Sequence, residues 1–132
     1  MATGTFGTAI NCIDGRVQAP VAEWLKTNHA LTYVDMVTVP GPDRALTQMT
    51  PEQVAPVRDA VAISVNAHHS KVIALAGHHD CAAFPASREA HASAVREAMQ
   101  VIAGWGLPAR VIGLWVNDAW QVEVVADTGA SA

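Results

Sequence analysis

Two cysteines and one histidine are the residues of this chain whose types and positions could hold a metal ion. Cys12 follows one apolar run, and His78 and Cys81 follow another, much later in the chain. Two thiolates and one imidazole suit zinc, and three protein ligands leave a fourth position for water or substrate. A zinc ion in such a site lowers the pKa of a bound water to about 7, which provides a hydroxide nucleophile near neutral pH. The sequence therefore predicts a zinc centre, provided that folding brings the three residues together.

The two segments together resemble the metal-binding motif of the β-class carbonic anhydrases. The first reads Cys-Ile-Asp-Gly-Arg from Cys12 to Arg16, and the second reads Gly-His-His-Asp-Cys from Gly77 to Cys81. Each half is a weak signal alone, but both halves in this order, each after an apolar strand, are specific. The resemblance implies hydration of carbon dioxide to bicarbonate by a zinc-bound hydroxide, with Cys12, His78 and Cys81 as the zinc ligands.

The same resemblance implies catalytic roles for Asp14 and Arg16. In this family the arginine holds the aspartate by charge-assisted hydrogen bonds, and the aspartate orients or deprotonates the water on zinc. In a second state known for the family, the aspartate itself binds zinc, so Asp14 is also an alternative fourth ligand. Without the resemblance, Asp14 and Arg16 could be an ordinary surface ion pair, which contributes little to stability.

The sequence departs from the family pattern around the predicted substrate pocket. Family members usually have an Arg-Asn-Ala segment after the second strand, whereas residues 39–44 here read Val-Pro-Gly-Pro-Asp-Arg. Gly15 stands where serine is most frequent, and the N-terminal helical arms of longer members are not evident. Two alternatives therefore stay open. One is a carbon disulfide or carbonyl sulfide hydrolase on the same scaffold, and the other is a non-catalytic zinc-binding domain in which Asp14 closes the metal site.

Simpler interpretations exist for the cysteines and histidines. Cys12 and Cys81 could be buried packing residues, or could form a disulfide in an oxidising compartment. The spacing to Cys81 favours His78 over His79 as the ligand. We hypothesise that His79 is a proton shuttle, because histidine titrates near neutral pH.

Other histidines and the tryptophans have weaker signals. His68 and His69 end a predicted helix, where they could interact with the helix C-terminus or form a second metal site. His29 and His91 have no evident role. The four tryptophans are expected to pack in the core or in a subunit interface: Trp24, Trp105, Trp115 and Trp120.

Apolar runs alternate with amphipathic helical patterns along the chain. Four strands are expected at residues 8–13, 33–39, 72–76 and 110–116, followed by an edge strand at 120–125. The almost continuous apolar run at 72–76 predicts burial on both faces. Helices are expected at residues 20–26, from Pro51 to about His68, and at 87–103. Thr50 and Gln53 form a capping box at the start of the second of these helices.

This order predicts an α/β fold with a four-stranded parallel sheet, helices on both faces and one additional edge strand. We expect a single domain over residues 1–132, with its core at about 8–125. In such sheets the ligand site lies beyond the carboxyl ends of the strands, where the strand order reverses. The Pro40-Gly41-Pro42 turn should lie at the pocket rim, and residues 127–132 should form a flexible tail.

The composition restricts the partners of the chain. Hydrophobic residues make up 51% of the chain, charged residues 15%, and the net charge is -4 without a cluster of Lys or Arg, which argues against nucleic acid. No stretch is long and apolar enough to cross a membrane, and the start has no secretory pattern, so the expected location is the cytoplasm. The small core and the family resemblance both favour a homodimer or a higher homo-oligomer.

Overall fold

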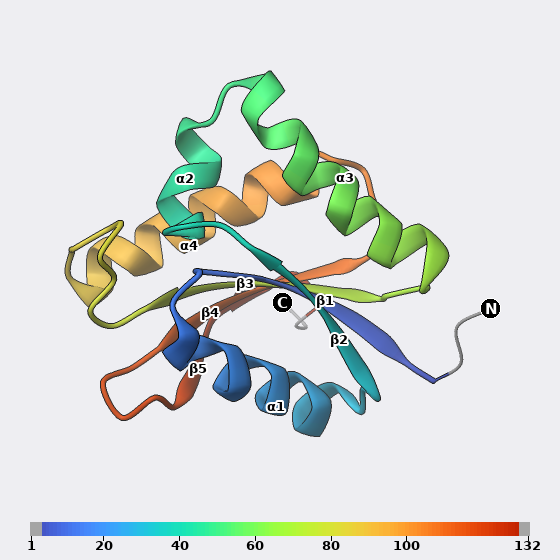
Figure 1. Ribbon diagram of the computed structural model, residues 1–132, viewed down its shortest axis with the longest axis horizontal. Helices are drawn as coiled ribbons and strands as arrows, with labels where there is room; N and C mark the ends of the chain where they lie inside the picture. The colour runs from blue at the N-terminus through green and yellow to red at the C-terminus, as the bar shows by residue number, and fades with distance from the viewer. Residues whose placement is uncertain (1–3, 130–132) are drawn as a thin grey trace.

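The structure is a computed structural model that describes residues 4–129 (Figure 1). Strands and helices alternate through most of the chain, and a short 3-10 turn, η1 (Gly15–Val17), follows the first strand. The strands are β1 (Phe6–Asn11), β2 (Tyr33–Thr38), β3 (Val72–His78), β4 (Arg110–Val116) and β5 (Val122–Asp127). The helices are α1 (Gln18–His29), α2 (Pro42–Gln48), α3 (Pro51–Ala67) and α4 (Arg88–Ala103).

The strands form one sheet in the order β2-β1-β3-β4-β5. β1 to β4 are parallel, and β5 pairs with β4 in the antiparallel direction. The predicted four-stranded parallel sheet with an added edge strand is thus confirmed. The chain moves from β1 to β2 on one side and later to β3 on the other, so the strand order reverses between β1 and β3.

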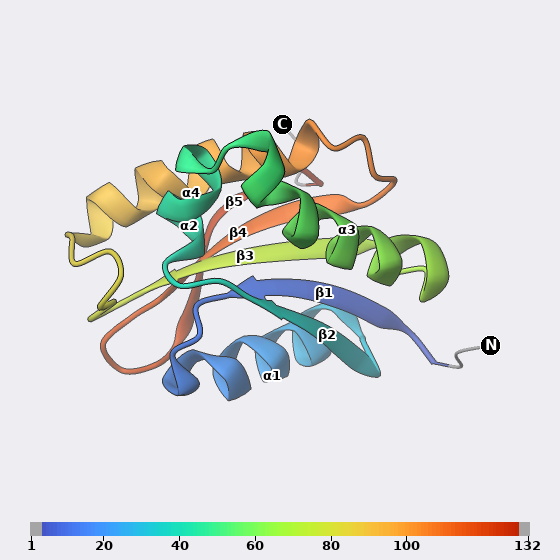
Figure 2. The ribbon, with the colours of Figure 1, turned by 45° about the horizontal axis from the view of Figure 1, so that its top comes forward.

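Helices cover both faces of the sheet, as expected for parallel strands joined by crossovers. α1 lies on one face, and α2, α3 and α4 lie on the other (Figures 1 and 2). One core cluster joins Val21 and Leu25 of α1 to alternate residues of the central strands. The other joins Val61 of α3 and Val95 of α4 to the intervening residues, such as Leu75. β3 is buried along its whole length because both of its faces are covered.

The helix starts follow from local sequence. Thr50 accepts a hydrogen bond from the backbone of Gln53, whose side chain accepts one from the backbone of Thr50, so the predicted capping box is present. Ser87 caps α4 in the same way through Ala90. The longest helix described between residues 4 and 129, α3, has 17 residues. None of the helices in that range is long and apolar enough to span a bilayer.

The segment after β2 differs from the prediction. The turn at Pro40-Gly41-Pro42 does end the strand, but Pro42 also begins α2, a helix that was not expected. Proline suits the first turn of a helix because that position has no hydrogen-bond partner for its N–H. Gly41 has a φ of 53°, and a Cβ there would lie 3.2 Å from the side chain of Ala83. The turn therefore packs against the loop that follows β3.

The C-terminal strand also begins and ends later than predicted. β5 starts at Val122, so Trp120 lies in the turn before it, with a φ of 59°. Arg110 donates to both carboxylate oxygens of Asp127, at 2.7 and 2.6 Å. The expectation of a flexible tail from residue 127 is wrong up to Gly129, and residues 130–132 lie outside the described part. The alternating pattern located the strand but not its ends, because its first residues are held by a turn.

Close packing of α4 on β4 gives a testable consequence at Gly113. A Cβ at this position would lie 2.4 Å from Val95 and 2.6 Å from Met99. We expect Gly113→Ala to lower the free energy of unfolding by about 1–3 kcal/mol through overpacking, measured by chemical denaturation. Gly15→Ala is the control, since nothing lies within 4 Å of its added Cβ. Equal stability of the two variants would contradict this packing.

Candidate metal centre

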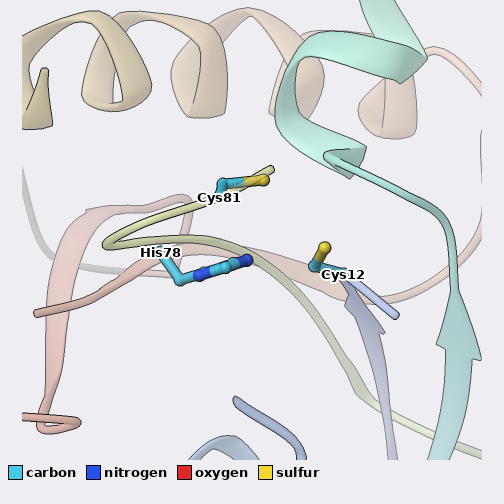
Figure 3. A group of neighbouring side chains, drawn as sticks. All are labelled: Cys12, His78 and Cys81. Atoms are coloured by element: carbon cyan, nitrogen blue, oxygen red, sulfur yellow. The ribbon is translucent and has the colours of Figure 1, made fainter. Parts of the chain in front are cut away.

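The reversal of strand order brings three predicted ligands together. Cys12 lies directly after β1, His78 is the last residue of β3, and Cys81 lies in the loop after β3 (Figure 3). One ligand atom from each residue lies within 4.8 Å of the other two. All three side chains are buried. Among residues 4–129, this is the one group of three or more such side chains with a geometry suited to a metal ion.

The imidazole of His78 has the tautomer that a metal ligand requires. Its Nδ1 lies 2.7 Å from the backbone oxygen of His79, and a carbonyl oxygen can only accept, so Nδ1 carries the proton. Nε2 therefore presents a lone pair. That atom is buried and has no hydrogen-bond partner among the described residues. An unpaired buried acceptor costs free energy, and a cation bound to it would remove the cost.

The two thiols fit the same cation. Cys12 and Cys81 are not joined in a disulfide. In the metal-free protein, burial raises the pKa of Cys81, the neighbouring Cys12 raises it further, and the backbone N–H groups of Phe84 and Ala83 act in the opposite direction. Two buried thiolates side by side are unfavourable without a positive charge between them. A divalent cation reverses this effect, because it favours deprotonated sulfur ligands.

Asp14 and Arg16 lie at the exposed rim of this cluster. Arg16 donates from Nε to Asp14 Oδ1 at 3.0 Å and from Nη2 to Oδ2 at 2.7 Å, and its backbone N–H donates to Oδ1 at 2.9 Å. These hydrogen bonds lower the pKa of Asp14 to about 2. The backbone contact also caps η1, so the turn after β1 fixes the carboxylate. Asp14 Oδ2 lies 4.0 Å from His78 Nε2, beside the free lone pair.

His79 and Asp80 continue from His78 to the surface. Both side chains are exposed, and they line a cleft of about 460 Å³ together with Cys81 and residues 85–87. The backbone N–H of His79 donates to Val116 at 2.9 Å, which extends the pairing of β3 with β4 by one residue. The ring of His79 is therefore held near the cluster but open to solvent.

A buried pair that the sequence interpretation missed supports the loop with Cys81. His91 hydrogen bonds through Nδ1 to Asp43 at 2.6 Å and donates from Nε2 to the backbone oxygen of Phe84 at 2.8 Å. Both side chains of the pair are 1% exposed. His91 stands one helical turn before Val95, so the helical periodicity could have placed it on the buried face of α4. Asp43 gave no such signal, because α2 was not predicted.

His68 lies at the C-terminal end of α3, as predicted, but its ring has partners that were not predicted. Its Nδ1 lies 2.6 Å from the carboxylate of Asp35, and the ring packs against Phe6. His69 is exposed in a left-handed conformation. Both line a cavity of about 530 Å³ at the amino ends of the strands, at the opposite edge from Cys12. Neither belongs to a second group with metal-binding geometry among the residues described.

Comparison with protein families gives a match over nearly the whole chain. A family model described as "Putative carbonic anhydrase" matches residues 2–126. This chain belongs to that family. The match includes every residue of the candidate centre, from Cys12 to Cys81. No curated protein matches the carbonic anhydrase-like chain.

Solved structures of β-carbonic anhydrases share the fold. A β-carbonic anhydrase of Trichomonas vaginalis is 11% identical and gives a TM-score of 0.62. The matched region covers 91% of this chain and 82% of the Trichomonas chain. One of two tetrameric β-carbonic anhydrases from Sordaria macrospora is 14% identical, with coverages of 99% and 84% and a TM-score of 0.61. A carbonic anhydrase of Streptococcus mutans is 16% identical, with coverages of 90% and 81% and a TM-score of 0.55. At these identities the likeness shows the β-carbonic anhydrase fold.

The pKa of Asp14 tests the contact with Arg16. We expect Arg16→Gln to return that pKa from about 2 toward 3.8 in metal-free protein, measured by carboxyl NMR. A carboxyl whose pKa is lower in the folded state stabilises folding above the unfolded value, and this is lost as the pH falls through the folded value. The variant should therefore lose less stability than the wild type between pH 3.8 and about 2. Arg58→Gln, at an exposed pair elsewhere, is the control, and an unchanged Asp14 titration would contradict the assignment.

Proposed function

We propose that this protein binds one zinc ion through Cys12, His78 and Cys81 and hydrates carbon dioxide to bicarbonate. The observation that carries this proposal is the convergence of three buried ligand atoms, one of them the unpartnered Nε2 of His78. Membership of the carbonic anhydrase-like family supports the same reaction. When bound, zinc supplies a Lewis acid with an open fourth position, which lowers the pKa of water there to about 7.

Asp14 is the group that would act on the water. Its Oδ2 lies 4.0 Å from His78 Nε2, so the carboxylate stands beside the residues that would hold the zinc. Because its pKa is about 2, Asp14 is ionised at neutral pH and is a weak base. Its role is therefore to accept a hydrogen bond and orient the water, while net proton removal falls to another group or to buffer.

The Asp14–Arg16 contact favours an open metal site over a closed one. For Asp14 to become the fourth ligand, it would have to give up its side-chain hydrogen bonds with Arg16 and the backbone contact that caps η1. Charge-assisted bidentate pairs of this kind are among the stronger protein hydrogen bonds. This argues against the non-catalytic alternative, in which Asp14 permanently closes the site.

The substrate is less constrained than the metal site. Where the family usually has Arg-Asn-Ala, residues 39–44 of this chain differ, and Asp43 is buried with its Oδ2 2.6 Å from His91 Nδ1. This departure is the observation that keeps a carbon disulfide or carbonyl sulfide hydrolase as the second candidate. Both reactions attack the carbon of a small apolar electrophile, so the same zinc site would serve either.

We also infer a homodimer or higher homo-oligomer. Ile13, beside Cys12, is 62% exposed, and Val124 on the edge strand is 50% exposed. An edge strand such as β5 presents unpaired backbone groups, and exposed apolar side chains on it and beside the site add surface that another subunit could cover. One of the structural relatives is described as tetrameric. Light scattering on purified protein would test this.

The proposed reaction has a direct test. We expect purified protein to contain one zinc per chain and to show stopped-flow hydration of carbon dioxide that rises with pH as the bound water ionises. Cys12→Ser should abolish both zinc binding and hydration. His69→Asn, which removes an imidazole at the opposite end of the sheet, is the matched control. Stoichiometric zinc without hydration would favour the non-catalytic alternative, and activity on sulfur analogues alone would favour the hydrolase.

The proton-shuttle hypothesis for His79 makes a separate prediction. Its ring is exposed in the cleft beside Cys81, where it can exchange protons with solvent. We expect His79→Ala to slow hydration most in weak buffer and to approach wild-type rates in strong buffer, measured by stopped flow over a series of buffer concentrations. Identical rates at every concentration would exclude this role.

A further inference from the structure

The guanidinium of Arg16 is held by more than Asp14. Its Nη1 donates to the carboxylate of Asp80 at 3.3 Å, and its Nη2 donates to the backbone oxygen of Asp80 at 3.2 Å. Its Cζ atom lies 4.5 Å from the ring centroid of Trp120. The contacts come from the loop after β3 and from the turn between β4 and β5. Segments far apart in sequence thus converge on one side chain at the rim of the metal site.

Trp120 has a backbone conformation that does not suit its bulk. Its φ is 59°, in the left-handed region that favours glycine. The turn holds it there: its N–H donates to the backbone of Asn117 at 2.9 Å, while the Asn117 side chain accepts from the N–H groups of Ala119 and Gln121. Asp80 also has a left-handed φ, of 57°. Both residues that contact Arg16 besides Asp14 are therefore in conformations that a tight turn imposes.

The left-handed backbone of Trp120 costs free energy, which the contacts of its side chain can offset. The half-buried indole lies under the guanidinium of Arg16, and its ring centroid is 6.5 Å from that of His78 and 6.3 Å from that of His79. An indole is the aromatic ring that binds a cation best. Strain of this kind is often found where a residue must point at a functional site.

We propose that Trp120, assisted by Asp80, is a positioning residue that keeps the Nε and Nη2 edge of Arg16 turned toward Asp14. The side chain of Arg16 is 46% exposed, so without further contacts it would sample many rotamers and hold Asp14 only part of the time. The indole face restricts the guanidinium plane, and Asp80 occupies the donors that Asp14 does not use. The catalytic meaning of this arrangement rests on the proposed function, in which Asp14 orients the water.

The competing explanation is that Trp120 only fills the core. It packs at the edge of the core cluster on the α1 face. A packing role predicts that loss of the indole destabilises the protein without changing Arg16. A positioning role predicts a change at Arg16 even when the fold is intact, so the two explanations differ in what is measured at that side chain.

Trp120→Gly and Trp120→Phe separate these explanations. Glycine removes the ring and relieves the positive φ, whereas phenylalanine keeps an aromatic face. In NMR spectra of the purified full-length chain, the heteronuclear ¹H–¹⁵N NOE of Arg16 Nε, assigned through Arg16→Lys, reports how rigidly the guanidinium is held. Unlike a ring-current shift, this NOE does not change merely because an aromatic ring is removed. We expect Trp120→Phe to retain most of the wild-type NOE and Trp120→Gly to lose it, while the Tm of each variant reports the effect on packing. Trp105→Phe, a tryptophan packed on the other face of the sheet, is the control.

The kinetic effect should follow the same order. The loss of an exposed cation–π contact corresponds to a decrease of about two- to fivefold in kcat/KM for Trp120→Gly, with rescue by Trp120→Phe. An unchanged Arg16 Nε NOE in Trp120→Gly, with or without a fall in Tm, would overturn the proposal. If the wild type shows no hydration of carbon dioxide, the proposed function fails, but the NMR comparison still decides whether Trp120 positions Arg16.

Discussion

The parallel pairing of β1 with β3 is the constraint on which the candidate centre depends. Ile10 lies opposite Leu75 in this register, so the two strands end at the same edge of the sheet, and the chain after each strand turns out of the sheet there. Cys12 and His78 come together because of this pairing alone, although a long stretch of chain separates them. Burial of β3 between two layers of helices makes the register stable, since a slip by one residue would exchange the faces of every side chain.

Buried polar atoms without a hydrogen-bond partner are found near the carboxyl ends of the parallel strands. In the described part of the chain, the buried side-chain atoms without a hydrogen-bond partner are Asn11 Oδ1, Asp43 Oδ1 and His78 Nε2. Asn11 and His78 are the last residues of β1 and β3, and Asp43 lies in α2, the helix that follows β2. Native proteins leave few such atoms, and each costs free energy. The other buried polar side chains, those of Thr8, Ser64, Ser70 and His91, are hydrogen-bonded. The unpaired Nε2 of His78 lies instead beside the thiols of Cys12 and Cys81, where a cation could bind.

Two pairs of acidic and basic side chains lie near the centre, one exposed to solvent and one buried. Asp14 and Arg16 lie at the solvent side, where the pair is fixed by several hydrogen bonds and can respond to water and substrate. Asp43 and His91 lie in the interior and tie α2, α4 and the loop after Cys81 into one unit. The first contact can serve chemistry because it is accessible. The second restrains the loop that carries Cys81, since a buried polar pair cannot separate without leaving unpaired groups behind.

Local sequence was enough to predict the strands, three of the helices, the ligand motif and the capping box at Thr50, because each depends on residues that are near in the chain. Apolar runs report burial, and cap residues report helix starts, whatever the tertiary structure is. The helix α2, the contact between Asp43 and His91, and the placement of Trp120 over Arg16 could not be predicted in this way. Each arises where distant segments meet, and only the packing of the folded chain decides which of many polar side chains become neighbours. The left-handed φ of Trp120 is the clearest example, because local preference opposes that conformation and the hydrogen bonds of the folded turn impose it.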